Sequence, residues 1–277
     1  MRRLAAVLGR DVSASLSPRL HAAAARALEL DLAYVPVSCP DTGHFVRAVE
    51  ALETLGALGA NVTVPYKRVA LDLADQVSST AAEIGAVNTL TFSAAGRRHG
   101  DNTDGPGLVR ALAELPAAVF ERVQILGAGG AARAAAWALA QLGVDDVHVT
   151  ARRNAEPVAE VANGKASTLE AVRGATLVVS CLPGDDALAR QALTDWVDMT
   201  KRPVVYDLAY GDEASPSALV AAAERRGLLA HDGRALLVEQ AALSLSLWTG
   251  ADAARARQAM RSELQPGGWR DARLDPG

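Results

Sequence analysis

The fold is decided by residues 122–132, which read Arg122-Val123-Gln124-Ile125-Leu126-Gly127-Ala128-Gly129-Gly130-Ala131-Ala132. Residues 122–126 have the length and apolar character of a short strand, and an alanine-rich helical stretch runs from 129 to 142. A tight glycine turn joins the two, with the spacing Gly-x-Gly-Gly-x-Ala. A strand, a glycine turn and a helix in immediate succession predict a parallel α/β unit.

The glycine turn also indicates a chemistry. Glycines let a pyrophosphate come close to backbone N–H groups at the positive end of the following helix. The context of strand, turn and helix therefore predicts a dinucleotide-binding loop at Gly127, Ala128, Gly129, Gly130, Ala131 and Ala132. The alternative is a tight strand–helix turn that binds no ligand.

The end of the next strand indicates which dinucleotide is bound. The expected strand 146–150 is followed by Ala151-Arg152-Arg153-Asn154, without an Asp or a Glu. A carboxylate at this point usually binds the ribose 2′-hydroxyl of NAD, whereas a guanidinium pairs with the 2′-phosphate of NADP. Arg152 and Arg153 therefore favour NADP. The alternative is that they are two solvated surface arginines.

Short apolar strands alternate with helices on both sides of this stretch, which predicts a parallel α/β protein with two domains. In the second domain we expect strands at 122–126, 146–150, 175–181 and 204–207. In the first we expect strands at 4–8, 31–37 and 60–64, and a hairpin of 87–93 and 97–100. Ser17 followed by Pro18 predicts a helix whose N-cap is Ser17. Helices are expected at 234–247 and 251–263, and the tail from Gln265 is expected to fray.

The composition excludes several classes of function. The 277 residues carry a net charge of −4, a pI of about 5.8 and no run of more than two basic residues, which argues against a nucleic-acid-binding surface. No apolar window is long enough to span a bilayer, and the run at 4–8 is too short for a signal peptide. The five histidines lack metal-ligand spacing, and Cys39 and Cys181 lack a CxxC partner. We expect a soluble cytoplasmic protein with reduced thiols, no metal site, and no membrane or nucleic-acid partner.

The most informative chemical stretch is Asn61-Val62-Thr63-Val64-Pro65-Tyr66-Lys67, at the end of the expected strand 60–64. Pro65 ends the strand because it has no N–H to pair and disfavours helix at the residue before it. Lys67 is therefore expected at the carboxyl end of a strand, where open α/β sheets bind ligands. Alone, it has the character of a solvated surface lysine. The nucleotide loop and the carboxylate of Asp104 together change that interpretation to nicotinamide-dependent chemistry on a small polar substrate. Asp104 has an alternative role as an Asx-type cap on the following helix, and the two roles can coexist.

With these residues in view, the chain resembles the shikimate dehydrogenase family over almost its full length. The family pattern SxSPxxHN is approached at 15–21, and the pattern NVTxPxK is complete at 61–67. Further matching segments are 86–89 (Ala-Val-Asn-Thr), 101–105 (Asp-Asn-Thr-Asp-Gly), 127–132, 150–153, 207–210, 232–240 and 248–250 (Trp-Thr-Gly). The chain departs from the family pattern at 151–153, where Ala-Arg-Arg stands in place of the usual strand end.

The resemblance implies a fold and an activity. The implied fold is an N-terminal αβα substrate domain over 1–104, completed by the C-terminal helices of 234–264, and a Rossmann-type NADP-binding domain over 105–233, with a cleft between them. The implied activity is the reversible, NADP-dependent reduction of 3-dehydroshikimate to shikimate, in the biosynthesis of chorismate and aromatic amino acids. Lys67 is then the proton-transfer residue, and Asp104 holds its ammonium group.

The resemblance also implies which residues bind the two ligands. The implied substrate-binding residues are Ser15, Ser17, Asn61, Thr63, Lys67, Asn88, Asp104, Tyr210 and Gln240. The implied cofactor-binding residues beyond the glycine loop are Thr150, Arg152, Arg153, Leu182, Leu208 and Gly233. The protein is expected to act as a monomer or a homodimer.

Two alternatives stay open. One is a relative that uses quinate or aminoshikimate and prefers NAD. Ser17 argues against quinate, because quinate-using relatives tend to carry Thr there, and the absence of an acid at 151–153 argues against NAD. The other is a catalytically idle, ligand-sensing protein on the same scaffold. The intact pair of Lys67 and Asp104 argues against that one.

Overall fold

The computed structural model describes residues 3–182, 187–211 and 215–264 of the chain. The expected frayed tail from Gln265 lies outside the described residues. Within the described residues, no helix combines the length and the apolar character needed to cross a membrane.

The chain divides into two compact units. Among the described residues, the first unit holds 3–107 and Leu237–Glu263, and the second holds Leu108–Leu236 and Leu264. The boundaries fall inside two helices, α5 (Asp104–Leu112) and α10 (Arg234–Thr249), so each of these helices contributes residues to both units.

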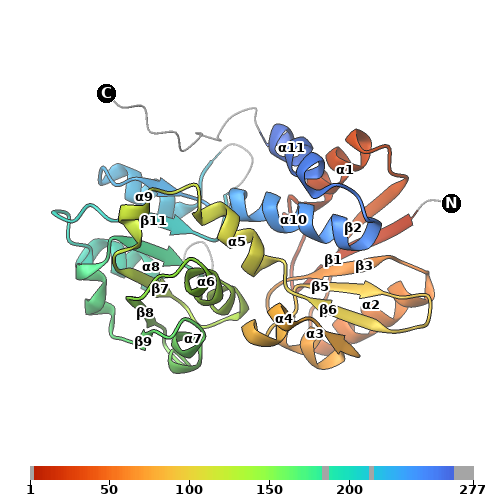
Figure 1. The fold of residues 1–277 in the computed structure, drawn as a ribbon, viewed down its shortest axis with the longest axis horizontal. Coiled ribbons are helices and arrows are strands. Elements are labelled where there is room, and N and C mark those ends of the chain that lie inside the picture. Colours follow the sequence, from red (N-terminus) through yellow and green to blue (C-terminus); the bar gives the residue numbers. More distant parts are fainter. Residues whose placement is uncertain (1–2, 183–186, 212–214, 265–277) are drawn as a thin grey trace. The chain divides into compact units, whose positions relative to one another are not determined.

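The first unit is built around a six-stranded sheet (Figure 1). Its strands are β1 (Arg3–Gly9), β2 (Leu32–Ser38), β3 (Gly59–Val62), β4 (Gln76–Val77), β5 (Thr89–Phe92) and β6 (Arg98–Asp101). Its helices, besides parts of α5 and α10, are α1 (Ser17–Ala27), α2 (Thr42–Thr54), α3 (Lys67–Leu73), α4 (Ser79–Ile84) and α11 (Ala253–Glu263). The strand order is β2-β1-β3-β5-β6-β4, with β1 parallel to β2 and β3, and β5 antiparallel to β3 and β6. The predicted strands and hairpin are thereby confirmed.

The core of the first unit follows from the alternation of side chains along its central strands. Ala6 and Leu8 of β1 point to one face, where they pack with Phe45 and Val49 of α2. In α10, apolar side chains occur all round the helix rather than on one stripe, and such a helix is buried on most sides. Trp248 near its end is buried, and its Nε1 donates to the carbonyl oxygen of Leu90 at 3.0 Å. This bond ties α10 to β5.

The second unit has its own six-stranded sheet. Its strands are β7 (Val123–Leu126), β8 (Val147–Thr150), β9 (Lys165–Ala166), β10 (Leu177–Ser180), β11 (Val204–Asp207) and β12 (Ala230–His231). Its helices, besides parts of α5 and α10, are α6 (Gly130–Gln141), α7 (Glu156–Val161), α8 (Ala187–Gln191) and α9 (Ala218–Arg225), with short turns η1 (Ala117–Phe120), η2 (Leu169–Gly174) and η3 (Ala192–Trp196).

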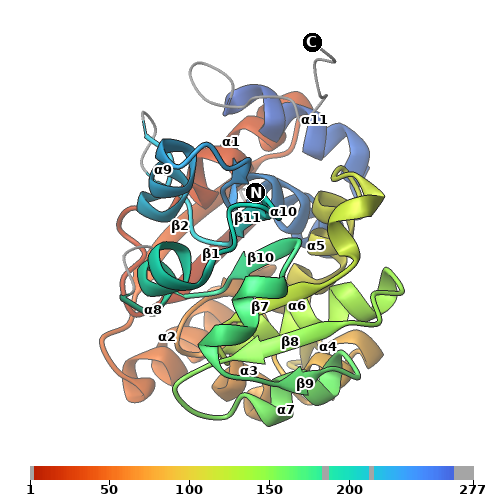
Figure 2. The same cartoon turned by 90° about the vertical axis from the view of Figure 1, so that its left-hand side faces the viewer.

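All neighbouring strands of the second sheet are parallel, and their spatial order is β9-β8-β7-β10-β11-β12. Figure 2 shows the part of this order from β9 to β11. Numbered in chain order from one to six, this is the 3-2-1-4-5-6 order of Rossmann folds. Every residue of β10 is buried: Leu177 and Val179 belong to one apolar cluster and Val178 to another. A parallel sheet of this kind is covered by helices on both faces, so it has an apolar core on each face. The predicted α/β fold with a Rossmann-type second half is confirmed.

Two details differ from the expectations. The N-cap of α1 is Leu16 rather than Ser17, because Ser17 already lies in the helix and its N–H donates to Oγ of Ser15 at 3.3 Å. The two-residue strands β4, β9 and β12 and the helix α7 are absent from the sequence-based expectation. A strand that short has no period-two pattern to detect, and pairing with a neighbour alone defines it.

Candidate active site

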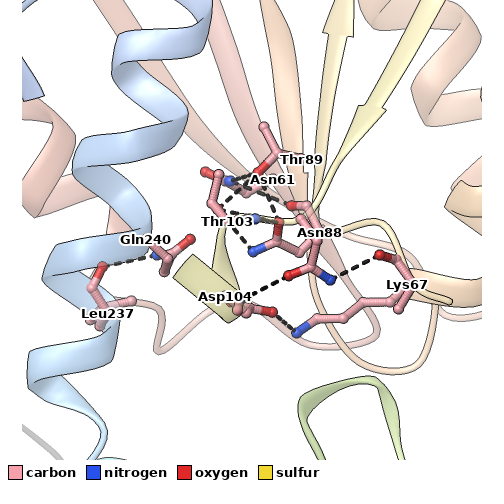
Figure 3. Close-up of polar contacts among 11 residues, drawn as sticks. Asn61, Lys67, Asn88, Thr89, Thr103, Asp104, Leu237 and Gln240 are labelled. Atoms are coloured by element: carbon pink, nitrogen blue, oxygen red, sulfur yellow. Dashed lines mark hydrogen bonds and ion pairs between the residues drawn. The ribbon is translucent and has the colours of Figure 1, made fainter. Parts of the chain in front are cut away.

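The first unit contains an ion pair between Lys67 and Asp104, the two residues predicted to be catalytic (Figure 3). Lys67 is the first residue of α3, and its carbonyl oxygen accepts from the Val87 N–H at 3.0 Å. Its Nζ lies 2.5 Å from Oδ2 of Asp104. The two side chains retain 13% and 12% of their exposure, so the pair is largely withdrawn from water but still reachable. A partly buried ammonium with a fixed acceptor can donate to an oxygen that gains negative charge.

Asp104 is available to Lys67 because another residue caps its helix. Asp104 is the first residue of α5, where the helix dipole favours a negative charge. The Oδ1 of Asn102 accepts from the Gly105 N–H at 3.1 Å, and its Nδ2 donates to the Ala86 carbonyl at 2.8 Å. Asn102 therefore fills the capping role considered for Asp104, and the carboxylate of Asp104 faces the lysine.

A buried network of amides and hydroxyls adjoins this pair (Figure 3). Asn88 accepts from the Thr103 N–H at 2.7 Å and donates to the Thr103 hydroxyl at 3.1 Å. Asn61 donates to the hydroxyl of Thr89 at 3.1 Å, and that hydroxyl donates to Oδ1 of Asn88 at 3.0 Å. Two amides predicted to bind substrate thus belong to one hydrogen-bonded group, with Thr89 between them.

Gln240 joins the same region from α10. A Cβ added to Gly107 would lie 3.0 Å from the Gln240 nitrogen, so α5 and α10 approach closely at this glycine. The Nε2 of Gln240 donates to the Leu237 carbonyl at 2.9 Å, which leaves Oε1 and one Nε2 hydrogen for another partner. Figure 3 shows the side chains of Gln240 and Asp104 on neighbouring helices.

Ser15, Ser17 and Thr63 lie in the same unit. Ser17 is buried, whereas Ser15 and Thr63 are partly exposed. The Thr63 N–H donates to the Leu8 carbonyl at 2.8 Å, and the Arg10 N–H donates to the Val64 carbonyl at 3.1 Å. These two bonds join the segment after β1, which leads to the serines, to the segment after β3, which leads to Lys67.

The predicted dinucleotide loop lies at the carboxyl end of β7. Gly127 has a φ of +118°, a conformation that L side chains rarely adopt, and its N–H donates to the Thr150 carbonyl at 2.9 Å. Gly129 is the N-cap of α6, and Ala132 is buried against the sheet. The partly or fully exposed residues of the loop are Ala128, Gly129, Gly130 and Ala131. A glycine turn that exposes the first N–H groups of a helix suits an anionic phosphate group.

Arg152 and Arg153 lie at the same sheet edge as this loop. β8 is parallel to β7, with Leu126 opposite Thr150, so 127–130 and 151–153 leave the sheet from the same edge. Both arginines are exposed there. The position fits recognition of a phosphate on the ribose that lies beyond the loop.

Thr150 has a different environment from the arginines that follow it. Its hydroxyl is buried, accepts from Gln124 Nε2 at 3.0 Å and donates to the Ser167 carbonyl at 3.0 Å. This hydroxyl is therefore engaged in holding the ends of β7 and β8 together.

The remaining predicted residues of the second unit also lie near its carboxyl edge. Leu182 and Leu208 follow the ends of β10 and β11, and the Gly233 N–H donates to the Ala209 carbonyl at 2.9 Å. Tyr210 follows in the same loop and is partly exposed. Tyr210 belongs to the second unit, whereas the other predicted substrate-binding residues belong to the first.

Asp207, at the end of β11, is the buried carboxyl group of this edge. Its Oδ1 accepts from the Ala209 N–H at 3.2 Å, so it shapes the turn that carries Leu208 and Tyr210. Burial raises the pKa of Asp207 to about 6, and the negative charge of Asp232 acts in the same direction. Because the folded state holds this proton more tightly than the unfolded chain, the group favours folding below about pH 4. That contribution is lost as the pH rises through about 6.

The Asp207→Asn variant should therefore gain stability relative to the wild type as the pH rises. Asparagine keeps an oxygen for the Ala209 N–H and removes the buried charge. The difference in the free energy of unfolding between variant and wild type should be about 1 kcal/mol more favourable at pH 8 than at pH 5. Thermal unfolding at both pH values measures it. Asp198→Asn, which alters a partly exposed carboxylate, is the control and should have the same effect at both pH values. A pH-independent effect of Asp207→Asn would contradict the assignment.

Several residues of the site carry no role in the sequence-based reasoning. Asn102, Thr89 and Thr103 stand inside segments that match the family, but their partners depend on strand pairing. In the antiparallel pair of β3 and β5, Asn61 lies directly opposite Thr89. Tyr34 on β2 donates to Oδ1 of Asn61 at 2.8 Å. The alternation of side chains along the expected strand 31–37 is the one sequence signal that could have placed this tyrosine on the same face of the sheet as Asn61.

Comparison with known proteins identifies the chain's relatives. The domain family described as the shikimate dehydrogenase substrate binding domain matches residues 7–90. A protein named shikimate dehydrogenase (NADP(+)) from Salinibacter ruber is 38% identical over 94% of this chain and 98% of its own length. The protein of the same name from Methanothermobacter thermautotrophicus is 36% identical over 89% of this chain and 90% of its own. The chain belongs to the shikimate dehydrogenase family.

A solved structure of the family supports the fold as well. Shikimate 5-dehydrogenase from Thermus thermophilus, in complex with NADP(H) and shikimate, matches with a TM-score of 0.76 and 32% identity. The match covers 94% of this chain and 99% of that one. Both units therefore belong to the fold of shikimate dehydrogenases, and the resemblance of the sequence to the family is confirmed.

Proposed function

We propose that this protein catalyses the reversible, NADP-dependent reduction of 3-dehydroshikimate to shikimate. The observation that carries the proposal is the ion pair of Lys67 and Asp104, with 2.5 Å between Nζ and Oδ2, next to a group of amides that suits a polyhydroxylated ring. Relatives that are 36% and 38% identical over most of the chain bear the name of this activity.

Lys67 acts on the oxygen of the reacting carbonyl. Bound NADPH supplies a hydride to the carbonyl carbon of the substrate. Negative charge then grows on the oxygen, and the ammonium of Lys67 stabilises that charge and donates the proton. Asp104 accepts from the ammonium and keeps it from turning into solvent. In the reverse direction the amine of Lys67 takes the proton of the substrate hydroxyl.

The residues assigned to the substrate belong to the first unit, except Tyr210, which belongs to the second. Ser15, Ser17 and Tyr210 are assigned to the carboxylate of shikimate, because hydroxyl groups can all donate to it. The residues assigned to the ring hydroxyls are Asn61, Thr63, Asn88 and Gln240. We therefore assign 1–104 with 234–264 as the substrate domain and 105–233 as the NADP domain. The match of the substrate-binding domain family to residues 7–90 supports this division.

NADP fits the residues of the second unit better than NAD. The positive φ of Gly127 and the exposed start of α6 leave room for a pyrophosphate at backbone N–H groups. Arg152 and Arg153 are exposed at the edge where the 2′-phosphate would lie, and no carboxylate stands at 151–153 to receive a 2′-hydroxyl. Leu182, Leu208 and Gly233 are assigned to the nicotinamide half of the cofactor.

A turnover assay tests the proposal. The purified protein is given shikimate with NADP, and the appearance of NADPH is followed. Parallel reactions replace shikimate by quinate or aminoshikimate, and NADP by NAD. We expect the highest kcat/KM with shikimate and NADP. Faster turnover of quinate would support the quinate-using alternative. The absence of turnover, with shikimate binding shown by calorimetry, would support a ligand-sensing protein.

The cellular setting follows from the same proposal. We place the enzyme in the cytoplasm, as a monomer or a homodimer. Cys39 is buried, Cys181 is partly buried, and neither is in a disulfide. Across the described residues, no group of three or more His, Cys, Asp or Glu side chains is placed to hold a metal ion. The reaction as proposed needs none, because Lys67 supplies the positive charge at the oxygen.

A further inference from the structure

The orientation of the Asn88 amide is set by the backbone. The N–H of Thr103 can only donate, and it lies 2.7 Å from the atom of Asn88 assigned as Oδ1. A flipped amide would place two donors against each other, so this atom must be the oxygen. Nδ2 then donates to the Thr103 hydroxyl at 3.1 Å, and the Thr89 hydroxyl donates to Oδ1 at 3.0 Å.

The orientation of the Asn61 amide is set in the same way. A backbone carbonyl can only accept, and the carbonyl oxygen of Asn88 lies 3.4 Å from Nδ2 of Asn61. The second Nδ2 hydrogen of Asn61 goes to the Thr89 hydroxyl at 3.1 Å, and that hydroxyl lies within hydrogen-bond distance of both Oδ1 of Asn88 and the Thr103 hydroxyl. Thr89 therefore lies between the two amides and is bonded to both.

Tyr34 secures the opposite side of Asn61. Its hydroxyl donates to Oδ1 of Asn61 at 2.8 Å. Its ring stacks on His21, with centroids 3.9 Å apart and planes 8° from parallel, and Trp248 tilts against both rings. Three elements, α1, β2 and α10, therefore hold this ring in place. Burial lowers the pKa of His21 to about 3, so the stack carries no charge at neutral pH.

The two amides differ in the hydrogen bond that each can still make: Asn88 can donate one, and Asn61 can accept one. Asn88 gives one Nδ2 hydrogen to the Thr103 hydroxyl and keeps the other, while its Oδ1 accepts from the Thr103 N–H and lies within hydrogen-bond distance of the Thr89 and Thr103 hydroxyls. Asn61 has used both Nδ2 hydrogens, so its Oδ1, which accepts from Tyr34 and faces His21, can only accept. An amide that could rotate would offer either group and would discriminate less between donor and acceptor ligands.

We propose that Tyr34 and Thr89 are positioning residues that hold the two amides in the orientation that the backbone groups allow, so that Asn61 offers an acceptor and Asn88 a donor to the substrate. The proposal rests on the proposed function, which assigns both amides to ring hydroxyls. It adds the direction of each bond: a hydroxyl at Asn61 donates its hydrogen, and an oxygen at Asn88 accepts one. Neither Tyr34 nor Thr89 itself has to touch the substrate.

The experiment compares Thr89→Val, Thr89→Ser and Tyr34→Phe. Thr89→Val and Tyr34→Phe each remove one hydroxyl at nearly constant shape. Each should raise the KM for shikimate about 3- to 12-fold, the effect of one hydrogen bond, with kcat and the KM for NADP within about twofold of the wild type. Thr89→Ser keeps the hydroxyl and should restore the wild-type KM. Both changes free the same Asn61 amide. The double variant should therefore raise the KM for shikimate by less than the product of the two single increases.

Thr91→Val is the matched control. Thr91 stands two residues along the same strand, and its buried Oγ1 has no hydrogen-bond partner among the described residues. Its removal should leave the KM for shikimate unchanged. A KM in Thr89→Val equal to that of the wild type would overturn the proposal. So would a Thr89→Ser variant as impaired as Thr89→Val, because packing rather than the hydroxyl would then be responsible.

Nuclear magnetic resonance separates a failure of this proposal from a failure of the proposed function. The side-chain NH₂ signals of Asn61 and Asn88 are recorded in the ligand-free, ¹⁵N-labelled protein. Both should move in Thr89→Val, and the Asn61 signal should move in Tyr34→Phe, but neither should move in Thr91→Val. If the wild type does not turn over shikimate while these shifts occur, the function is wrong and the positioning network stands. If the signals do not move, the positioning network is wrong even if the enzyme is active. If Thr89→Val does not fold, the Asn61 signal in Tyr34→Phe provides the test.

Discussion

The Lys67→Ala variant should lose about 10²- to 10⁴-fold in kcat for shikimate, while the KM changes by much less. A positioned acid–base group contributes about this factor to a proton-transfer step. In this protein the lysine is held 2.5 Å from Asp104, with 13% of its side chain exposed, so its ammonium is already oriented before the reaction begins. The KM is less affected because the serines, the amides and Gln240 are assigned to hold the substrate in the ground state.

Steady-state kinetics with saturating NADP measure this effect. Lys201→Ala, which alters an exposed lysine of the second unit, is the control and should leave kcat unchanged. Thermal unfolding should be recorded for both variants, because Lys67→Ala leaves the mostly buried carboxylate of Asp104 without its cation. A folded Lys67→Ala variant that keeps more than about a third of the wild-type kcat would remove the lysine from the mechanism.

The Arg152→Ser variant should bind NADP about 10- to 150-fold more weakly and NAD almost as well as the wild type does. A charge-assisted hydrogen bond to a phosphate contributes roughly 1.5–3 kcal/mol, which corresponds to that factor. The position of Arg152 supports this: it is exposed, and it leaves the sheet beside the glycine loop, because Leu126 and Thr150 are partners in the parallel pair of β7 and β8.

Fluorescence titrations with NADPH and NADH give the two dissociation constants separately. The Arg153→Ser variant is the neighbouring comparison and shows whether one arginine or both contact the phosphate. Arg47→Ser, at an exposed position on α2, controls for the loss of a surface charge and should affect neither constant. Equal losses for NADPH and NADH in Arg152→Ser would mean that this arginine supports the fold and does not select the phosphate.

Much of the architecture could be read from the sequence, because local patterns dictate it. The strand, glycine turn and helix of 122–142 are consecutive, so no long-range information was needed to place them. The arginines after β8 could be placed by the same reasoning, since the carboxyl ends of parallel strands share an edge. The short edge strands β4, β9 and β12 could not, because a two-residue run is defined only by the neighbour with which it pairs.

For the candidate site, too, the sequence identified some features and the tertiary structure was needed for others. The sequence by itself determined which side chains carry charge and amide groups at the strand ends, and Lys67 and Asp104 stand out as a possible pair although they are 37 residues apart. It left open whether Asp104 caps α5 or faces Lys67, because an aspartate can do either. The tertiary structure decided this: Asn102 bonds the Ala86 carbonyl, which brings its Oδ1 to the helix end and leaves Asp104 to Lys67.

The direction of each hydrogen bond in the amide group is likewise a property of the tertiary structure alone. The sequence shows that Asn61, Asn88 and Thr89 are present, but an amide has a donor and an acceptor side, and either can face a ligand. The antiparallel register of β3 and β5 places Thr89 opposite Asn61, and the Thr103 N–H and Asn88 carbonyl then allow only one arrangement. Backbone groups cannot exchange donor for acceptor, so the fold determines the polarity that the side chains present to the substrate.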